Sequence, residues 1–153
     1  MSSSSTDRAE AIDLVASNLL GRAARLTRLL MRSGAHEISR TEVGVLATLS
    51  EGPRRITQLA MTEALAQPTV TQLIDKLEGR GLVARSRSDQ DGRVVLVAIT
   101  AAGAKALETV RALIRANMRE ALADLPDAEL IELAHAADTM GSLIQKLLPD
   151  LDA

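Results

Sequence analysis

Apolar residues recur at helical spacing near the N-terminal end of the chain. The positions that follow this period are Ile12, Val15, Leu19, Leu26 and Leu30. Intervals of three, four or seven residues place them on one face of a helix. The pattern therefore predicts one long amphipathic helix over about 8–31, which the run Ser33, Gly34, Ala35 ends.

A capping motif marks the start of the next helix. Ser39 and Glu42 have the S-x-x-E spacing in which each side chain bonds the other residue's backbone amide. Gly52 and Pro53 follow as helix breakers. We therefore expect a second helix that ends at about Ser50.

Two further helices are separated by only a few small residues. A short helix is expected over about 55–63, and the small residues at 64–66 then form a turn. Another helix should run over 67–78, because Gly79 and Gly81 supply its end. Two helices joined by a tight turn predict a helix-turn-helix.

The pattern then alternates between strand and helix. The β-branched and apolar runs over 82–87 and 93–99 flank a loop at 88–92 that is rich in Asp and Gly, which predicts a β-hairpin. Helical periodicity returns over about 100–123 and 128–148. The predicted order is four helices, a hairpin and two helices.

These elements predict a mainly α fold with a small β-hairpin wing (α+β), a winged helix-turn-helix with long N- and C-terminal helices. We expect a disordered N-terminus at 1–7 and a DNA-binding lobe at 36–100. The helices at 8–33 and 101–148 carry more apolar surface than one small winged domain covers. They are therefore expected to form a dimerisation region in a homodimer.

The helix over 67–78 has one apolar and one polar face. At 100° per residue, the apolar face consists of Val70, Leu73, Ile74 and Leu77. The opposite face carries Pro68, Gln72, Asp75 and Gly79 at its centre, with Thr69, Thr71 and Lys76 on its flanks. Short polar side chains can approach base edges, and Gln can bond adenine through two hydrogen bonds. This face suits the major groove of double-stranded DNA.

The hairpin offers a second contact with DNA. Arg85 and Arg87 lie on its first strand, and Arg93 lies just past its tip. An arginine at the tip of a narrow ribbon suits the minor groove, where negative potential is enhanced. Asp91 is placed to hold Arg93 by a charge-assisted hydrogen bond. The wing over 85–95 is therefore expected in the minor groove.

Composition removes several other classes of function. The chain has no Phe, Tyr or Trp, whose rings stack bases in proteins that read RNA or single strands. It has no Cys, which excludes thiolate metal sites and thiol redox sensing. The net charge is −2, but residues 54–93 hold seven Lys and Arg against five Asp and Glu. The basic excess thus falls on the segment expected to meet DNA.

Nothing in the sequence predicts an enzyme, a metal centre or a cofactor. His36 and His135 are the only histidines and are far apart, and no acidic cluster has metal-ligand spacing. No phosphate-binding glycine loop or nucleophile elbow is present. With no signal peptide and no long apolar run, we expect a cytoplasmic protein with no membrane association.

The stretch ALAQPTVTQLIDKLEGRGLVARSRSDQDGRVVLVAITAAG resembles the MarR (multiple antibiotic resistance regulator) family of winged-helix repressors and activators. The groove-facing residues that this resemblance implies are Pro68, Thr69, Thr71, Gln72 and Lys76. It also implies Asp91 and Arg93 as the wing-tip pair, and terminal helices that interlock between subunits. The chain departs from the family in two places, with Ala66 where a Ser or Thr cap is usual and Gln72 where Arg is common.

Family members often bind small aromatic or phenolic acids, so the resemblance also implies such an effector. With no aromatic ring available, a pocket here would be lined by aliphatic side chains. The candidate anion partners are Arg22, Arg25 and His36.

The leading hypothesis is a dimeric repressor that binds a pseudo-palindromic operator. A winged-helix interaction dimer without DNA binding is the alternative, and substitutions at Arg93 and Gln72 would then have no effect. A small-molecule-binding protein without a DNA target is the third reading. It predicts ligand-induced stabilisation without salt-sensitive binding to duplex.

Overall fold

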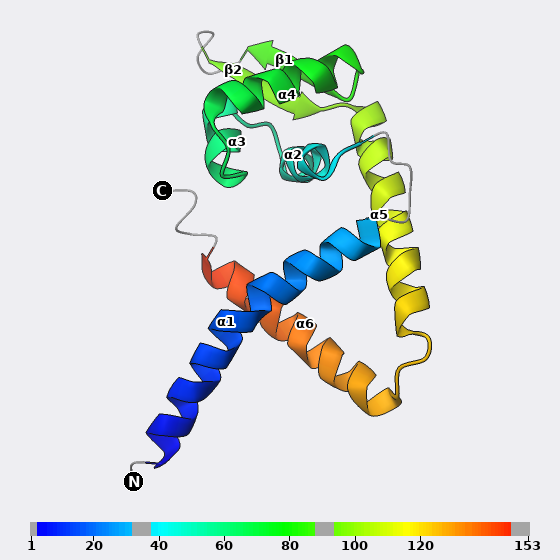
Figure 1. The fold of residues 1–153 in the computed structure, drawn as a ribbon. Helices are drawn as coiled ribbons and strands as arrows, with labels where there is room; N and C mark the ends of the chain where they lie inside the picture. The colour runs from blue at the N-terminus through cyan, green and yellow to red at the C-terminus, as the bar shows by residue number, and fades with distance from the viewer. Residues whose placement is uncertain (1–2, 32–37, 88–93, 148–153) are drawn as a thin grey trace. The chain divides into compact units, whose positions relative to one another are not determined.

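The computed structural model describes residues 3–31, 38–87 and 94–147, with side chains from residue 7 onward. Contacts divide the chain into two units, at 1–35 and 36–153, and the first contains helix α1 (Ser3–Met31). The second unit contains α2 (Arg40–Ser50), α3 (Ile56–Thr62), α4 (Gln67–Gly79), β1 (Val83–Arg87), β2 (Val95–Ile99), α5 (Ala101–Leu122) and α6 (Asp127–Leu147) (Figure 1). The predicted element order and fold class are confirmed.

The N-terminal helix begins earlier than the sequence pattern predicts. α1 starts at Ser3 instead of Arg8, so residues 3–7, expected to be disordered, are helical. Serine has a low helix propensity, but a polar run directly before a helix can continue its hydrogen-bond ladder.

The start of α2 confirms the predicted capping box. The Ser39 hydroxyl accepts a hydrogen bond from the Glu42 amide at 3.3 Å, and the Ser39 amide donates to Glu42 Oε2 at 2.5 Å. Two of the amides that a helix leaves unpaired at its N-terminus are thereby satisfied.

The turn between α3 and α4 contains an alanine in the left-handed backbone conformation that glycine usually adopts. Ala64 has φ 52°, in the left-handed region. The Leu65 amide bonds Ala60 O at 3.0 Å and the Ala64 amide bonds Met61 O at 3.2 Å, the two bonds of a Schellman motif. This motif turns the chain sharply into α4.

A Schellman motif also ends α4, and here the left-handed residue is a glycine, as is usual for this motif. Gly81 has φ 70°, the Leu82 amide bonds Leu77 O at 2.9 Å, and the Gly81 amide bonds Glu78 O at 2.8 Å. The chain therefore passes directly from the predicted recognition helix into β1.

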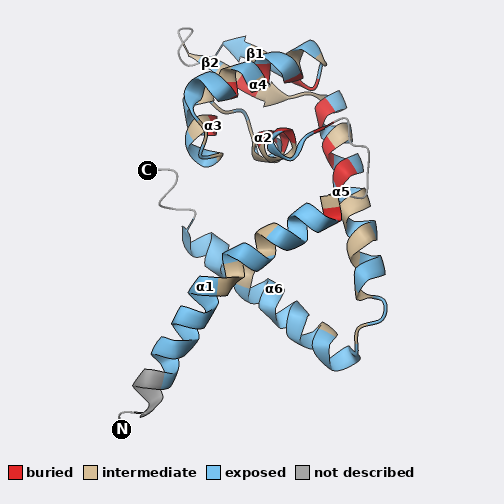
Figure 2. Ribbon diagram, viewed as in Figure 1, coloured by how far each residue is buried: buried red, intermediate tan, exposed pale blue. Residues whose placement is uncertain are grey.

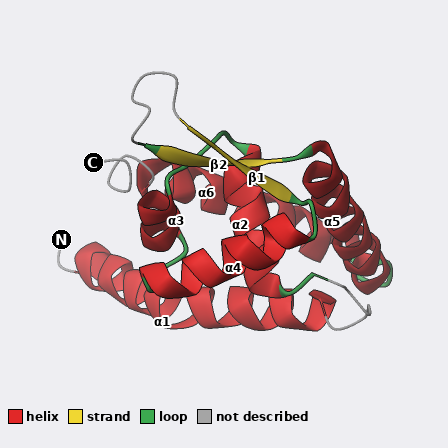
Figure 3. Ribbon diagram, turned by 90° about the horizontal axis from the view of Figure 1, so that it is seen from above, coloured by secondary structure: helices red, strands yellow, loops and turns green. Residues whose placement is uncertain are grey.

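The two strands form an antiparallel hairpin at one edge of the helices of the lobe (Figure 3). Arg85 lies opposite Val97, and Arg87 lies opposite Val95. Arg54, which precedes α3, bonds the backbone of Val97 from the other side, with N···O distances of 3.0 and 2.8 Å. β2 is thus held between β1 and the segment before α3.

Thr100 and Gly103 join the hairpin to α5. The Thr100 hydroxyl accepts from the Gly103 amide at 3.1 Å and donates to Gly81 O at 2.7 Å. The Thr100 amide bonds Leu82 O at 3.1 Å. A Cβ at Gly103 would lie 2.0 Å from that same oxygen, so only glycine allows this approach.

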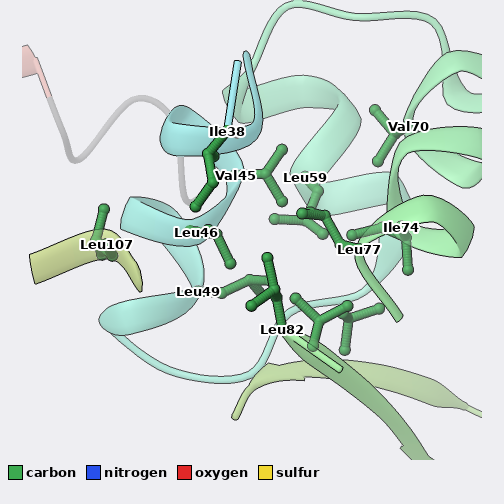
Figure 4. Packing of buried hydrophobic residues seen from close by; sticks show 12 residues of the cluster. Ile38, Val45, Leu46, Leu49, Leu59, Val70, Ile74, Leu77, Leu82 and Leu107 are labelled. Atoms are coloured by element: carbon green, nitrogen blue, oxygen red, sulfur yellow. The ribbon is translucent and has the colours of Figure 1, made fainter. Parts of the chain in front are cut away.

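One apolar core holds the lobe together (Figure 4). Its members come from just before α2 through the first turns of α5: Ile38, Val45, Leu46, Leu49, Leu59, Val70, Ile74, Leu77, Leu82, Val83, Val97 and Leu107. Three of the four apolar residues predicted for α4 are fully buried here, and Leu73 is half-buried at the edge.

Most described residues of α1 and α6 are exposed (Figure 2), and they include large apolar ones. In α1 these are Ile12, Leu14, Val15, Leu20, Leu26 and Leu29, and in α6 they are Ile131, Leu133, Leu143, Ile144 and Leu147. No residue of α6 is buried. None of the described helices contains an apolar stretch of the length that spans a membrane.

Candidate nucleic-acid interface

The face of α4 that points away from the core is built from short or uncharged polar side chains. Pro68, Thr69 and Gln72 are exposed, as the helical wheel predicts. Thr71 is half-buried, and its hydroxyl donates to Gln67 O at 3.0 Å. Gln72 has no hydrogen-bond partner among the described residues, so its carboxamide is available to a base edge.

The N-terminus of α4 has little capacity to bind phosphate. Ala66 at the N-cap provides no side-chain hydrogen bond. Pro68 has no amide proton, and the Thr69 amide already bonds Ala66 O at 2.9 Å. Backbone amides at this end therefore contribute little to phosphate binding.

Lys76 lies on the flank of this face but is paired within the protein. Its Nζ is 3.0 Å from Glu42 Oε1, and Arg80 Nη1 is 3.2 Å from the same oxygen. Glu42 is 1% exposed, whereas the Lys76 side chain is 61% exposed. One buried carboxylate at the start of α2 thus anchors the C-terminal half of α4.

Burial alone would raise the pKa of Glu42. Hydrogen bonds from the Ser39 amide, from Lys76 and from the Ser39 hydroxyl outweigh burial, so its pKa lies below the ordinary value of 4.5. Glu42 is therefore ionised at neutral pH despite being buried.

Arg85 is held by two carboxylates of α4. Its Nη2 is 2.6 Å from Asp75 Oδ1, and its Nη1 donates to Glu78 Oε2. The Arg85 backbone amide donates to Glu78 Oε1 at 3.1 Å. Burial would lower the pKa of Arg85, but the bonds to Asp75 and Glu78 raise it above its usual range. The wing and the predicted recognition helix are thereby joined.

Beyond Arg85 the hairpin loses its packing. Ser86, Arg87 and Val95 are exposed, whereas Val97 is fully buried. No carboxylate of a described residue pairs with Arg87, which is therefore available to a phosphate. The predicted wing-tip pair, Asp91 and Arg93, lies outside the described residues.

The candidate ligand residues lie partly in α1. Arg22 and Arg25 are exposed, and Arg22 lines a hollow of about 240 Å³ along α1 with Leu14, Val15, Asn18 and Leu19. His36 lies outside the described residues. Within the described ranges no cluster of His, Asp and Glu could hold a metal ion.

Sequence patterns did not reveal the ion pairs around α4. Glu42 was identified only as a capping residue, and Asp75 only as part of the polar face. Lys76 is 34 positions from Glu42, and Arg85, ten positions from Asp75, lies on a different element. The one available signal was a carboxylate at the end of the helix, Glu78, seven residues before Arg85.

The sequence is similar to that of known transcription regulators. The MarR family profile matches residues 38–95. An HTH-type transcriptional regulator of Mycobacterium tuberculosis is 33% identical over 134 residues, which cover 86% of this chain and 94% of that protein.

Two solved structures resemble the fold. Wild-type MarR of Escherichia coli has a TM-score of 0.69 at 22% identity, covering 81% of this chain and 95% of that chain. The transcriptional repressor CouR, solved bound to a 23-mer DNA duplex, has a TM-score of 0.63 at 24% identity. That match covers 87% of this chain and 95% of that chain.

Proposed function

This chain belongs to the MarR family of DNA-binding transcription regulators, and from that premise we propose that it is a homodimeric repressor of a pseudo-palindromic operator. The observation that carries this proposal is the two-sided character of α4. One side supplies Val70, Ile74 and Leu77 to the core. The other side presents polar side chains to solvent, among them the uncharged Gln72 and the paired Asp75 and Lys76. A helix anchored in this way can enter the major groove without rearrangement.

We propose that the segment 67–78 reads the major groove and that the wing over 85–95 reaches the minor groove. Gln72 is the residue expected to choose a base, because its carboxamide can bond adenine through two hydrogen bonds. Pro68, Thr69 and Thr71 fix how closely the helix approaches. Arg87 and Arg93 are the expected phosphate and minor-groove contacts of the wing.

The homodimer is proposed from the exposed apolar faces of α1 and α6. The regions 8–33 and 101–148 form the dimerisation part, although α5 also contributes Leu107 to the core of the lobe. Ile131 is 58% exposed and Leu147 is 55% exposed, with polar residues between them. An apolar surface of this extent is typically covered by a partner, and a second copy is the simplest one.

The repressor role and the effector complete the proposal. CouR, which shares the fold, is itself a repressor bound to DNA. A small aromatic or phenolic acid is the proposed effector, with Arg22, Arg25 and His36 as partners for its carboxylate. The exposed guanidinium of Arg22 beside apolar α1 residues suits such an amphipathic anion.

A DNA-binding titration tests the function. The full chain would be mixed with the duplex that lies upstream of its own gene and, in parallel, with a random-sequence library for site selection. We expect two protomers per site and binding that weakens as salt is added. Gln72→Ala should change the preferred base, while Arg93→Ala should weaken binding to every site.

Two outcomes would contradict this function. A monomer in light scattering, at the protein concentration used for the titration, would contradict the proposed homodimer. No selected sequence and no salt-dependent affinity would favour the alternative, a winged-helix interaction dimer without DNA binding.

A further inference from the structure

Arg85 differs from Arg87, the other basic wing residue that the structure describes, in how fully its hydrogen-bonding capacity is used. Its guanidinium contacts Asp75 and Glu78, its backbone amide contacts Glu78 again, and its side chain is 26% exposed. Arg87 lies on the same strand, two residues further out, and therefore on the same face of the hairpin. Arg87 is exposed and is not paired with any carboxylate that the structure describes.

The backbone geometry explains why Glu78 is placed at Arg85. The Val97 amide, opposite Arg85, points toward Arg54 O, so this residue pair is not hydrogen-bonded within the hairpin. The Arg85 amide therefore faces the outer edge of β1, where an unpaired amide would be exposed. The Glu78 carboxylate accepts from this amide and from the side chain of the same residue.

From this geometry we propose that Arg85 is a positioning residue that fixes the wing to the recognition helix and does not itself contact DNA phosphate. The proposal rests on the proposed function, because it concerns how the two DNA-reading elements keep a fixed spacing. Arg85 lies at the last point of β1 that contacts the lobe, since Ser86 and Arg87 beyond it are exposed. The angle at which the outer hairpin leaves the lobe is therefore set at Arg85.

The ion pair between Arg85 and Asp75 also changes the charge of the groove-facing surface. Asp75 is at the centre of the polar face of α4, where an unpaired carboxylate would repel phosphate. The ion pair with Arg85 compensates this charge without placing a further base-contacting residue in the groove. A lysine cannot replace arginine here, because its single ammonium does not reproduce the planar fork that meets two carboxylates.

The test compares two substitutions that keep the charge on the same strand, Arg85→Lys and matched Arg87→Lys. Amide hydrogen exchange of the DNA-free full chain is measured at Arg85, whose amide donates to Glu78, and at Ser86 and Leu96, the neighbouring hydrogen-bonded pair of the hairpin. We expect Arg85→Lys to raise exchange there about tenfold, as the outer hairpin opens more often, and Arg87→Lys to leave it unchanged. Unchanged exchange in Arg85→Lys overturns the positioning role.

The same variants are then titrated with the duplex that the wild-type chain selects from a random library, at several salt concentrations. Arg85→Lys should bind about tenfold more weakly with the same salt dependence, whereas Arg87→Lys should bind like wild type. Wild-type affinity in Arg85→Lys overturns the proposal, because a phosphate contact needs only the charge. If wild type selects no duplex, the proposed function fails, and hydrogen exchange alone decides the positioning role.

Discussion

Gly103→Ala tests whether the joint between the wing and α5 is as closely packed as the structure shows. The new Cβ would lie 2.0 Å from Leu82 O and 2.9 Å from Ile99 Cγ1. Leu82 O is a backbone atom that accepts a hydrogen bond from the Thr100 amide at 3.1 Å. It therefore cannot move away from the new Cβ without breaking that hydrogen bond.

The expected magnitude follows from three contributions. Forcing a methyl group into a packed site costs about 1–3 kcal/mol. Losing the hydrogen bond between Thr100 and Leu82 costs about 1 kcal/mol. Alanine gains up to about 1 kcal/mol over glycine in a helix. The free energy of unfolding should therefore fall by about 1–3 kcal/mol.

The assay is urea denaturation followed by far-ultraviolet circular dichroism, because the chain has no aromatic residue to report by fluorescence. Protein concentration is held constant, since dimerisation would couple stability to it. Gly79→Ala is the matched control in the same lobe, because nothing lies within 4 Å of its added Cβ. A midpoint for Gly103→Ala at or above that of wild type would refute the packing argument.

Three further substitutions probe the local structure around α4. Ala64→Gly should stabilise the chain by about 1 kcal/mol, because Ala64 has φ 52° and glycine adopts this conformation without strain; equal unfolding midpoints would contradict this. Ala66→Ser should add about 1 kcal/mol by supplying the missing cap of α4, measured by the same denaturation. Glu42→Gln should cost about 1–3 kcal/mol at pH 7, because it leaves Lys76 and Arg80 without their counter-ion. Folding lowers the pKa of Glu42, so its stabilisation is present above about pH 4.5 and disappears as pH falls through the lowered pKa. The stability gap between wild type and Glu42→Gln should therefore narrow in acid, and a constant gap would contradict the ionised state.

Local signals in the sequence were enough to predict the helices and strands and which face of each is apolar. The capping box of Ser39 and Glu42 and the apolar period of α4 both depend on residues within a few positions of each other, and the structure confirms them. Gly81 was predicted as a helix end because glycine is the usual residue of that motif. Ala64 adopts the same conformation without being glycine, so only the structure reveals it.

The partners of the site residues depend on tertiary packing, which local patterns do not contain. Glu42 and Lys76 are 34 positions apart, and they meet only because the core brings the start of α2 against α4. Lys76 and Arg85 were predicted as DNA contacts from their charge and their position. Whether a charge on a helix face is free or paired is decided by neighbours from other elements.

The number of basic residues left unpaired limits how strongly DNA affinity can depend on salt concentration. Between residues 38 and 87 the structure describes seven Lys and Arg residues, of which Arg54, Lys76, Arg80 and Arg85 pair with carboxylates. Those without a described carboxylate partner are Arg40, Arg55 and Arg87. With Arg93 added, a dimer has eight lobe cations for phosphates, which limits the slope of log affinity against log salt to roughly −7.

A titration of the wild-type chain over a range of salt concentrations measures that slope directly. A slope of −7 or shallower means that the ion pairs around α4 persist on DNA, so that affinity depends mainly on contacts such as those of Gln72. A slope near −10 or steeper corresponds to about eleven neutralised phosphates. It would require Lys76, Arg80 or Arg85 to exchange its carboxylate for phosphate, or the arginines of α1 to reach the duplex. Repeating the titration with Arg87→Gln checks the conversion from cations to slope, because losing one phosphate contact per protomer should make the slope shallower by about 1.8.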